Sequence, residues 1–304
     1  MPSSFRPRLL AFAQLMRLPN VFTAFADIAM TACAALAVLA SMGSEYPQAI
    51  ALIAAASGCL YLAGMVWNDV FDLAEDTRDR PFRPLPSGRI TLRAAAIIAS
   101  LLTLAGVGFA AVAGTATLGI ALACSVLLYD SWLKRTPIGP IAMAVCRFLN
   151  VLLGLSAIPE ELLGWSLRIH IAGVVGVYIV GVTWFARTEA SASNRWHLRG
   201  AASVIAVSLV LALTLRARLG ENPAPAAYLF PYLLAAFGFY VGLPLVRAIG
   251  QPGPKEVQAA VKRCVLGLVA LDAVLGTAFV GAPGLLILLL LPPALLVGKW
   301  VYST

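Results

Sequence analysis

Charged residues are scarce in this chain of 304 residues, and histidine is nearly absent. Asp, Glu, Lys and Arg together make up 12% of the sequence, whereas 61% of it is hydrophobic, with two histidines and five cysteines. So little charge excludes an ordinary soluble domain. The histidines lack metal-ligand spacing and no two cysteines form a CxxC pair, so neither residue type indicates a metal or redox site. We expect the cysteines to be small buried residues.

Apolar segments of about 20 residues recur along the whole chain, which is the length that a helix needs to cross a hydrocarbon layer of roughly 30 Å. Because backbone groups in lipid must be hydrogen-bonded internally, such continuous segments predict helices rather than barrel strands. We predict an all-α, polytopic membrane bundle of nine or ten transmembrane helices, a single domain over residues 1–304. The predicted spans are 19–41, 48–72, 92–113, 115–134, 138–158, 169–187, 200–220, 226–247, 257–281 and 284–302. The count stays open because "GAPG" (281–284) divides the last two and "LPPA" (291–294) can break or kink the final one.

The basic residues are unevenly distributed between the two ends of the predicted spans. The net charge is +8, from 22 basic and 14 acidic residues. With the N-terminus placed inside, 18 Lys and Arg lie in inside segments, and only Arg168, Arg216 and Arg218 lie outside. This asymmetry predicts a multi-pass protein of the inner or plasma membrane, embedded in the lipid bilayer, with a cytoplasmic N-terminus and no nucleic-acid partner. We expect no removable signal peptide.

Four acidic residues crowd the end of the second predicted span, namely Asp69, Asp72, Glu75 and Asp76. Asn68, Asp72 and Asp76 lie four residues apart and therefore share one helix face. Like charges this close repel, and a hard cation such as Mg²⁺ relieves the repulsion and commonly bridges to phosphates. Five arginines follow between Arg78 and Arg93, and guanidinium groups bind phosphate oxygens. The pattern favours a metal and phosphate site, with a solvated helix end as the alternative.

The segment "NDVFDLAED" (68–76) resembles the Asn-Asp-x-x-Asp-x-x-x-Asp motif of the UbiA superfamily of membrane prenyltransferases. Three further segments resemble that family, namely "LMRLPN" (15–20), "RPFRPLPSGRIT" (80–91) and "LLYDSWLKRTPIGP" (127–140). The resemblance runs in the same order from about residue 14 to residue 280. It implies a helical bundle around a central cavity, in which Mg²⁺ bridges an isoprenyl diphosphate to two acidic motifs on opposite helices. Ionisation of the allylic C–O bond then yields a carbocation that an acceptor attacks.

The resemblance also implies site residues. The expected metal ligands are Asn68, Asp72, Asp76 and Glu189, and the expected catalytic residues are Asp69, Asp72 and Lys134. The expected substrate-binding residues are Arg17, Asn20, Arg78, Tyr129, Arg135, Arg147, Asn150, Arg187, Asn194 and Arg195. Arg147 and Asn150 join this set because a polar residue inside a span lines a cavity or is paired by default; the alternative is an internal ion pair. The candidate partners in such a pair are Asp27, Asp130 and Asp272. We expect Asp27 and Asp272 to be buried structural acids, while Asp130 stays open.

The chain departs from the family at the inner end of the sixth span, where the family carries a second Asp-rich motif. The sequence there reads "VTWFARTEASASNRWHLRG" (182–200), and its one acid is Glu189. The sequence therefore predicts one complete acidic motif, with basic residues taking over part of the neutralisation of a diphosphate. The segments most similar to the EboC-type branch of UbiA-like proteins are 139–154, 185–194 and 261–276.

We predict an intramembrane, Mg²⁺-assisted prenyltransferase that transfers an isoprenyl group from a prenyl diphosphate to an unidentified acceptor. The alternative is a non-catalytic membrane protein of the same fold that binds or exports a lipid or a polar metabolite. The absence of the second Asp-rich motif favours the alternative, whereas the complete first motif favours the enzyme. The sequence leaves the oligomeric state and the prenyl chain length open.

Overall fold

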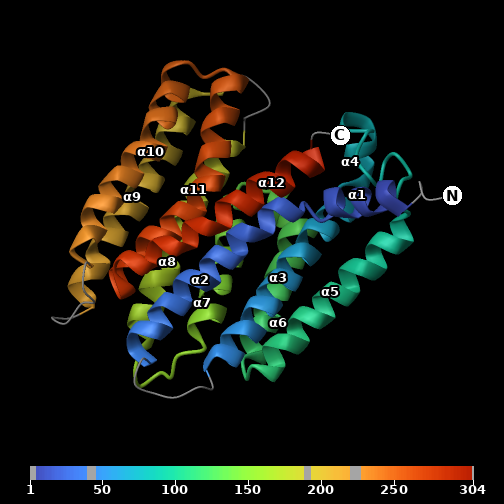
Figure 1. Ribbon diagram of the computed structural model, residues 1–304. Coiled ribbons are helices and arrows are strands. Elements are labelled where there is room, and N and C mark those ends of the chain that lie inside the picture. Colours follow the sequence, from blue (N-terminus) through green and yellow to red (C-terminus); the bar gives the residue numbers. More distant parts are fainter. Residues whose placement is uncertain (1–4, 40–45, 188–192, 220–226, 303–304) are drawn as a thin grey trace.

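The computed structural model describes residues 5–39, 46–187, 193–219 and 227–302, and every regular element in these ranges is a helix (Figure 1). The helices that run through the bundle are α2 (Val21–Leu39), α3 (Tyr46–Phe71), α5 (Leu92–Val112), α6 (Ala116–Ser131), α7 (Gly139–Leu155), α8 (Trp165–Ala186), α9 (Arg195–Arg218), α10 (Phe230–Gly250) and α11 (Pro254–Val280). The shorter α-helices are α1 (Phe5–Leu15), α4 (Leu73–Asp79) and α12 (Leu291–Tyr302). The 3-10 helices are η1 (Leu18–Asn20), η2 (Leu133–Arg135), η3 (Ala227–Leu229) and η4 (Ala282–Leu290).

The predicted polytopic helical fold is confirmed. Eight helical segments of the described chain are long and apolar enough to cross a membrane. Two shorter apolar helices, α6 with 16 residues and α7 with 17, occupy the predicted spans 115–134 and 138–158. The expected interruption in the last segment is also present, because η4 gives way to α12 at Leu291, directly before Pro292 and Pro293. Proline suits the first turn of a new helix, where its missing N–H is not needed.

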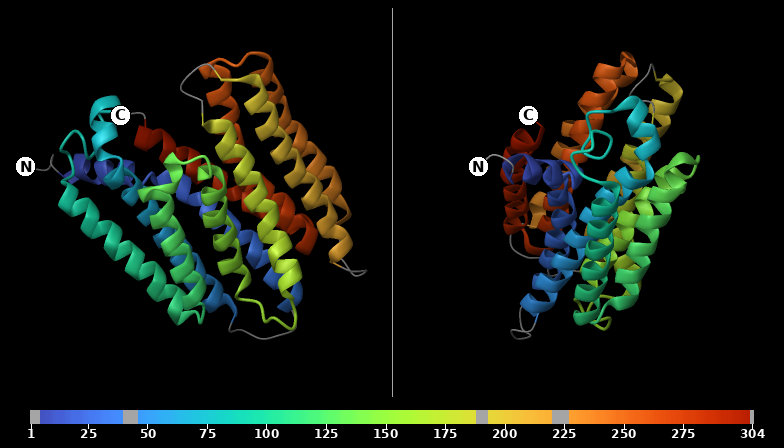
Figure 2. Two further views of the ribbon diagram at one scale, coloured as in Figure 1. Left: turned by 180° about the vertical axis from the view of Figure 1, so that it is seen from behind. Right: turned by 90° about the vertical axis from the view of Figure 1, so that its right-hand side faces the viewer.

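The bundle has a buried centre and lipid-facing edges. Within their most apolar windows, α11 is 72% buried and the segment containing α2 is 61% buried, whereas α5 is only 22% buried. Figures 1 and 2 show α5 at one edge of the bundle and α9 with α10 at the opposite edge. These outer helices expose large apolar side chains such as Leu104 and Phe239. Such surfaces destabilise a soluble protein but suit contact with lipid.

Two short helices, α1 and α4, lie at one end of the bundle and were not predicted from the sequence. Figure 1 places both near the described ends of the chain, with α1 beside α12. The Gln14 side chain of α1 donates a hydrogen bond to the Val301 carbonyl at 2.9 Å. This hydrogen bond joins α1 to α12 at the end of the bundle that also carries α4 and the acidic motif.

Close packing of η4 against α11 depends on glycine. A Cβ atom on Gly284 would lie 2.5 Å from the Gly276 carbonyl carbon and closer still to the Thr277 amide nitrogen. Because these are backbone atoms, Gly284→Ala is expected to force the two segments apart, at a cost of roughly 1–3 kcal/mol. The midpoint of thermal unfolding in detergent should fall by several degrees. Gly173→Ala is the matched control, since nothing lies within 4 Å of a Cβ atom there, and equal midpoints for the two variants would contradict this packing.

Candidate functional site

A break between α3 and α4 brings the acidic motif together. Asp72 lies between the two helices with φ −92° and ψ 4°, so α3 ends at Phe71 and a separate helix begins at Leu73. Asp69 of α3 and Asp76 of α4 are both buried, at 3% and 2% exposure. A buried carboxylate requires a positively charged partner, because an unpaired charge is costly to remove from water.

Arginines supply that partnership, and the exposed Arg80 is the most distant of them, 3.8 Å from Asp76. Arg83, in the loop after α4, donates to Asp76 at 2.6 Å and lies 3.5 Å from Asp69. Arg17 donates to Asp69 at 2.9 Å and to the Asn68 amide oxygen at 3.2 Å. Arg17 has a left-handed backbone conformation, with φ 44°, at the turn between α1 and η1.

Asp72 is held by the segment that follows α6. Lys134 Nζ and Arg135 Nη2 each lie 2.7 Å from a different oxygen of the Asp72 carboxylate. Arg135 also donates to the Phe71 carbonyl at 3.3 Å. The Lys-Arg segment and the acidic motif, which are 62 residues apart in the sequence, therefore meet in one cluster.

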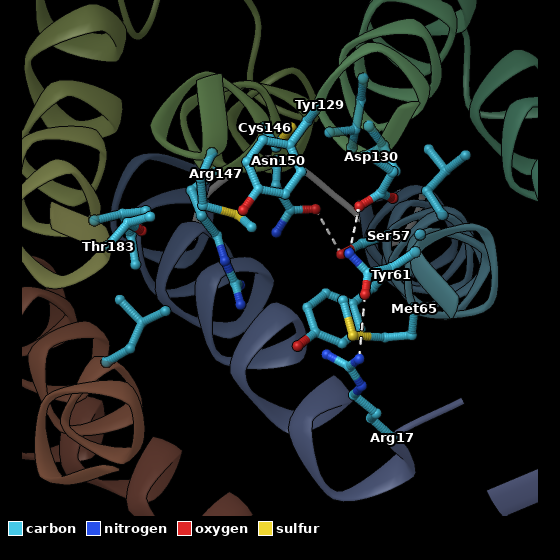
Figure 3. Close-up of a pocket in the computed structure, with 18 of the residues that line it drawn as sticks. Arg17, Ser57, Tyr61, Met65, Tyr129, Asp130, Cys146, Arg147, Asn150 and Thr183 are labelled. Carbon is cyan, nitrogen blue, oxygen red and sulfur yellow. Dashed lines mark hydrogen bonds between the residues drawn. The ribbon is translucent and has the colours of Figure 1, made fainter. Parts of the chain in front are cut away.

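A cavity of about 270 Å³ opens beside this cluster, inside the bundle (Figure 3). Its polar lining consists of Arg17, Ser57, Tyr61, Asn68, Tyr129, Asp130, Arg147, Asn150 and Thr183. The rest of the lining is mostly apolar and includes Leu60, Leu122 and Ile179. Asn68 connects the cluster with the cavity, because its amide group donates to Asp130 at 3.1 Å.

The acidic and basic side chains of the cluster and the cavity mouth largely compensate one another. The carboxylates are those of Asp69, Asp72, Asp76 and Asp130, and the cations are Arg17, Arg83, Lys134 and Arg135, with the exposed Arg80 3.8 Å from Asp76. Each cation thus has an anionic partner in the free protein. A ligand that carries both a metal ion and a diphosphate can enter such a site by exchange of partners, with the metal on the carboxylates and the phosphates on the basic side chains.

The donor set suits Mg²⁺ that arrives together with phosphate. Within the described ranges, no three acidic, His or Cys side chains converge as a metal site would require. Mg²⁺, however, is usually bound through one or two carboxylates and completes its shell with water and substrate phosphates. The carboxylates of Asp72 and Asp76 and the amide oxygen of Asn68 are hard donors of that kind. The residues therefore fit a shared metal–phosphate site rather than a metal cage made by the protein alone.

Two predicted substrate-binding residues near the cluster lie apart from its acids. Arg78 in α4 is exposed, and Arg83 takes the position beside the buried carboxylates. Asn20 ends η1, and its backbone carbonyl accepts a hydrogen bond from Thr23. By contrast, the predicted residues Tyr129, Arg147 and Asn150 line the cavity.

The predicted residues at the end of α8 and the start of α9 have backbone partners. Arg187 donates to the carbonyls of Thr136 and Pro137, and so anchors the loop that follows Arg135. Arg195 donates to the Gly250 carbonyl at 3.0 Å, and Asn194 caps α9 by accepting from the Trp196 amide. Glu189, the acid expected to replace the second Asp-rich motif, lies outside the described residues.

Four residues of the site were not selected from the sequence, namely Arg83, Tyr61, Ser57 and Thr183. Arg83 is one of five arginines in a short segment, and its role depends on how the loop 80–91 turns. Tyr61 and Ser57 lie about two and three turns before Asn68, along the α3 face that also carries Gly64. Their helical spacing from Asn68 is the signal that could have found them.

The sequence profile of the UbiA prenyltransferase family matches residues 28–249, well over half of the chain. The chain belongs to this family. Curated relatives share shorter segments with it. It is 29% identical over 174 residues to the digeranylgeranylglyceryl phosphate synthase of Saccharolobus solfataricus, covering 56% of this chain and 59% of that protein. It is 37% identical over 114 residues to the synthase of the same name from Methanoculleus marisnigri, covering 36% of this chain and 40% of that protein. The chain thus spans less than two thirds of the length of these UbiA-family relatives.

Solved structures share the fold over most of the chain. A structure of a digeranylgeranylglyceryl phosphate synthase in membranes superposes with a TM-score of 0.64 at 18% identity, covering 89% of this chain and 99% of that chain. A UbiA homologue from Archaeoglobus fulgidus, bound to GPP and Mg²⁺, superposes with a TM-score of 0.53 at 12% identity, covering 85% and 99%. At these identities the likeness establishes the UbiA fold alone.

Proposed function

We propose that this UbiA-family protein is an intramembrane prenyltransferase that moves an isoprenyl group from its diphosphate to an acceptor with the help of Mg²⁺. The observation that carries the proposal is a cluster of paired acidic and basic side chains at the mouth of a largely apolar cavity. The cluster consists of Asp69, Asp72 and Asp76 with Arg17, Arg83, Lys134 and Arg135. A prenyl diphosphate matches this arrangement, because its highly charged head suits the cluster and its apolar tail suits the cavity.

The basic side chains are placed to receive the leaving group. Lys134 and Arg135 compensate Asp72 in the free protein. With substrate bound, we expect them to turn to phosphate oxygens, because charge-assisted hydrogen bonds to phosphate are strong and those of arginine can be bidentate. Negative charge that develops on the diphosphate as the allylic C–O bond breaks is then stabilised by preorganised donors.

Mg²⁺, when bound, neutralises diphosphate charge and so assists departure of the leaving group. Asn68, Asp72 and Asp76 would hold it, as the sequence predicts, and Glu189 is the further ligand that the resemblance to the family implies. Asp69 orients Arg17 and Arg83 toward the site through its ion pairs. The apolar cavity wall, including Leu60, Leu122 and Ile179, would hold the isoprenyl chain and exclude water from the cation.

The orientation and the acceptor belong to the same proposal. The excess of Lys and Arg on one side supports a cytoplasmic N-terminus, which places the cluster at the cytoplasmic end of the bundle. The named relatives make digeranylgeranylglyceryl phosphate, so a hydroxyl group of a glyceryl compound is one candidate nucleophile. The resemblance of residues 139–154, 185–194 and 261–276 to the EboC-type branch stays a prediction.

A second candidate function is binding or export of a lipid or polar metabolite without chemistry. It is favoured by the segment 182–200, which carries one acid where the family has an Asp-rich motif. In this segment Arg187 and Arg195 donate to backbone carbonyls. The enzyme is preferred because the first motif is complete and has its basic partners in place.

The two functions are separated by a turnover assay. Membranes that contain the protein are incubated with radiolabelled farnesyl or geranylgeranyl diphosphate and a lipid extract as acceptor source, with Mg²⁺ or with EDTA. We expect inorganic diphosphate and a labelled, acid-stable lipid to form with Mg²⁺ and not with EDTA. If the prenyl diphosphate is retained by the membranes but never consumed, the binding function replaces the enzymatic one.

A further inference from the structure

A buried ionic network crosses the bundle along the inner part of the cavity. Arg147 of α7 donates to Asp27 of α2 at 2.9 Å and to the Thr23 hydroxyl at 2.5 Å. Asn150, nearly one turn further along α7, donates to the same Asp27 oxygen at 2.7 Å. The Asn150 amide oxygen accepts from Ser57 of α3 at 2.6 Å. Three helices are joined here by polar side chains inside an otherwise apolar bundle, where such residues mark functional sites by default.

The positive charge of Arg147 is compensated within this network. Asp27 is 0% exposed, and Asp272 of α11, also 0% exposed, lies near enough to interact electrostatically with both Asp27 and Arg147. Neither Asp272 oxygen has a hydrogen-bond partner among the described residues. One guanidinium group therefore faces two carboxyl groups. The network has no excess positive charge with which to hold an anion.

The cavity side of Arg147 nevertheless offers hydrogen bonds. Only two of its five N–H groups are taken up by Asp27 and Thr23, and the guanidinium lies 5.3 Å from the centre of the Tyr61 ring. The hydroxyl groups of Tyr61, Tyr129 and Thr183 also line the cavity, and no hydrogen bond joins them to other described residues. Figure 3 shows Arg147, Tyr129 and Tyr61 around one space. These groups face the cavity, so their hydrogen-bonding capacity is open to a ligand that enters it.

The depth of these groups suits the atom that reacts. Tyr61 precedes Asn68 by seven residues on α3, which at 1.5 Å per residue places it about 10 Å deeper in the bundle. The diphosphate head belongs at the cluster, so the first carbon of the prenyl group lies between the cluster and Tyr61. A hydroxyl group bound beside Tyr61 and Arg147 is thus close to the carbon that it must attack.

We propose that Arg147, Tyr61, Tyr129 and Thr183 form the acceptor subsite and that it takes an uncharged, hydroxyl-bearing acceptor. This inference rests on the proposed prenyl transfer. The acceptor oxygen forms a bond to the first carbon of the prenyl group, the bond from that carbon to the diphosphate oxygen breaks with its electron pair, and the hydroxyl proton passes to the released diphosphate. Asp27 and Asp272 are positioning residues, which hold Arg147 toward the cavity and cancel its charge.

The test uses pairs of acceptors that differ only in charge. The full-length protein in vesicles receives geranylgeranyl diphosphate, Mg²⁺ and either glycerol or myo-inositol, each beside its monophosphate, and dioleoylglycerol serves as a lipid-borne alcohol. We expect diphosphate release and prenyl-ether formation to be at least about tenfold faster with each uncharged acceptor than with its monophosphate. The reason is that a network without net positive charge cannot compensate the free-energy cost of removing a phosphate group from water. Comparison of the rates with soluble alcohols and with dioleoylglycerol shows whether the subsite prefers a water-soluble alcohol or one carried by a membrane lipid.

Variants separate the subsite from the rest of the site. Tyr61→Phe and Thr183→Val remove one hydroxyl group each, and we expect each to raise the KM for the alcohol about fivefold with unchanged affinity for the prenyl diphosphate. Tyr232→Phe, at an exposed position on α10, is the matched control and should leave both values unchanged. The combined change of Arg147→Met with Asp27→Asn and Asp272→Asn removes the guanidinium and both carboxyl groups together, so that no unpaired charge is left buried, and should abolish the response to alcohols.

The outcomes are distinct. If the phosphorylated acceptors are preferred, or if Tyr61→Phe and Thr183→Val behave like Tyr232→Phe, the subsite is wrong while prenyl transfer stands. It is equally wrong if a lipid extract supports consumption of the prenyl diphosphate and none of the alcohols does. If the prenyl diphosphate is not consumed with any acceptor, the proposed function fails and the subsite fails with it.

Discussion

Replacing Asp72 with Ala is expected to lower Mg²⁺-dependent consumption of prenyl diphosphate by about two to three orders of magnitude, the range found when one preorganised charge contact of a transition state is removed. Asp72 lies at the break between α3 and α4 and is the shared partner of Lys134 and Arg135. The Asp72→Ala change removes an expected metal ligand. It also removes the carboxylate that positions Lys134 and Arg135, the two basic residues that should act on the leaving group. Initial rates with radiolabelled geranylgeranyl diphosphate measure the effect.

Glu75→Ala is the matched control for this loss. Glu75 lies in α4, three residues beyond Asp72, and its side chain is exposed. The control variant should keep nearly the full rate, and both proteins should unfold at similar temperatures. A rate for Asp72→Ala that equals that of Glu75→Ala would remove Asp72 from the catalytic site.

Replacing Arg168 with Ala is expected to destabilise the whole bundle. Arg168 of α8 is 5% exposed, and its guanidinium donates to the carbonyls of Leu155, Leu163 and Ile158 at the opposite end of the molecule from α1 and α4. The variant leaves these three carbonyls without their donor, and each buried unsatisfied group costs about 1–3 kcal/mol. The midpoint of thermal unfolding in detergent should fall by about 5–10 °C.

Two further variants show whether the hydrogen bonds are responsible. Arg168→Lys keeps the charge, but one ammonium group cannot reach all three carbonyls in the fork geometry of arginine, so we expect only partial recovery. Arg218→Ala removes an exposed arginine that donates to Ser166 at 3.1 Å and should leave the midpoint unchanged. Full stability in Arg168→Ala would show that the loop between α7 and α8 does not depend on this residue.

The membrane architecture was predictable because it depends on a local quantity, the length of each apolar segment. Each predicted span contains a helix, and even the interruption before Pro292 follows from the missing N–H of proline. Helices α1 and α4 were missed because they are short and are stabilised by distant contacts. The Gln14 bond to the Val301 carbonyl, across 287 residues, leaves no trace in the sequence.

The acidic residues of the site could be predicted from the sequence, whereas the basic residues that pair with them could be predicted only in part. The spacing of Asn68, Asp72 and Asp76 predicted the motif. Among the arginines that follow it, Arg83 contacts Asp69 and Asp76, whereas Arg78, which was predicted to bind the substrate, is exposed. The choice depends on the turn of the loop 80–91, where Gly88 has φ 71°. No local pattern determines which of several nearby arginines points inward.

The partner of Arg147 in the buried ionic network could not be predicted from the sequence either. Asp27, Asp130 and Asp272 were equally suitable partners for Arg147 on the basis of sequence. Which of them meets Arg147 depends on the depth and rotation of three different helices. The structure pairs Arg147 with Asp27 directly, while Asp130 bonds to Asn68 and belongs to the cavity mouth. Cavity lining and internal pairing, which the sequence presented as alternatives for Arg147, are both realised.

The central claim is that one acidic motif and its basic partners bind a metal and a prenyl diphosphate together. Binding of radiolabelled geranyl S-thiolodiphosphate, which resists ionisation, to the purified protein in vesicles at increasing Mg²⁺ tests it most directly. We predict saturable binding that requires Mg²⁺, is competed by inorganic diphosphate, and is lost in Asp72→Ala while Glu75→Ala retains it. Binding that is independent of Mg²⁺, or equally strong in Asp72→Ala, would contradict the account.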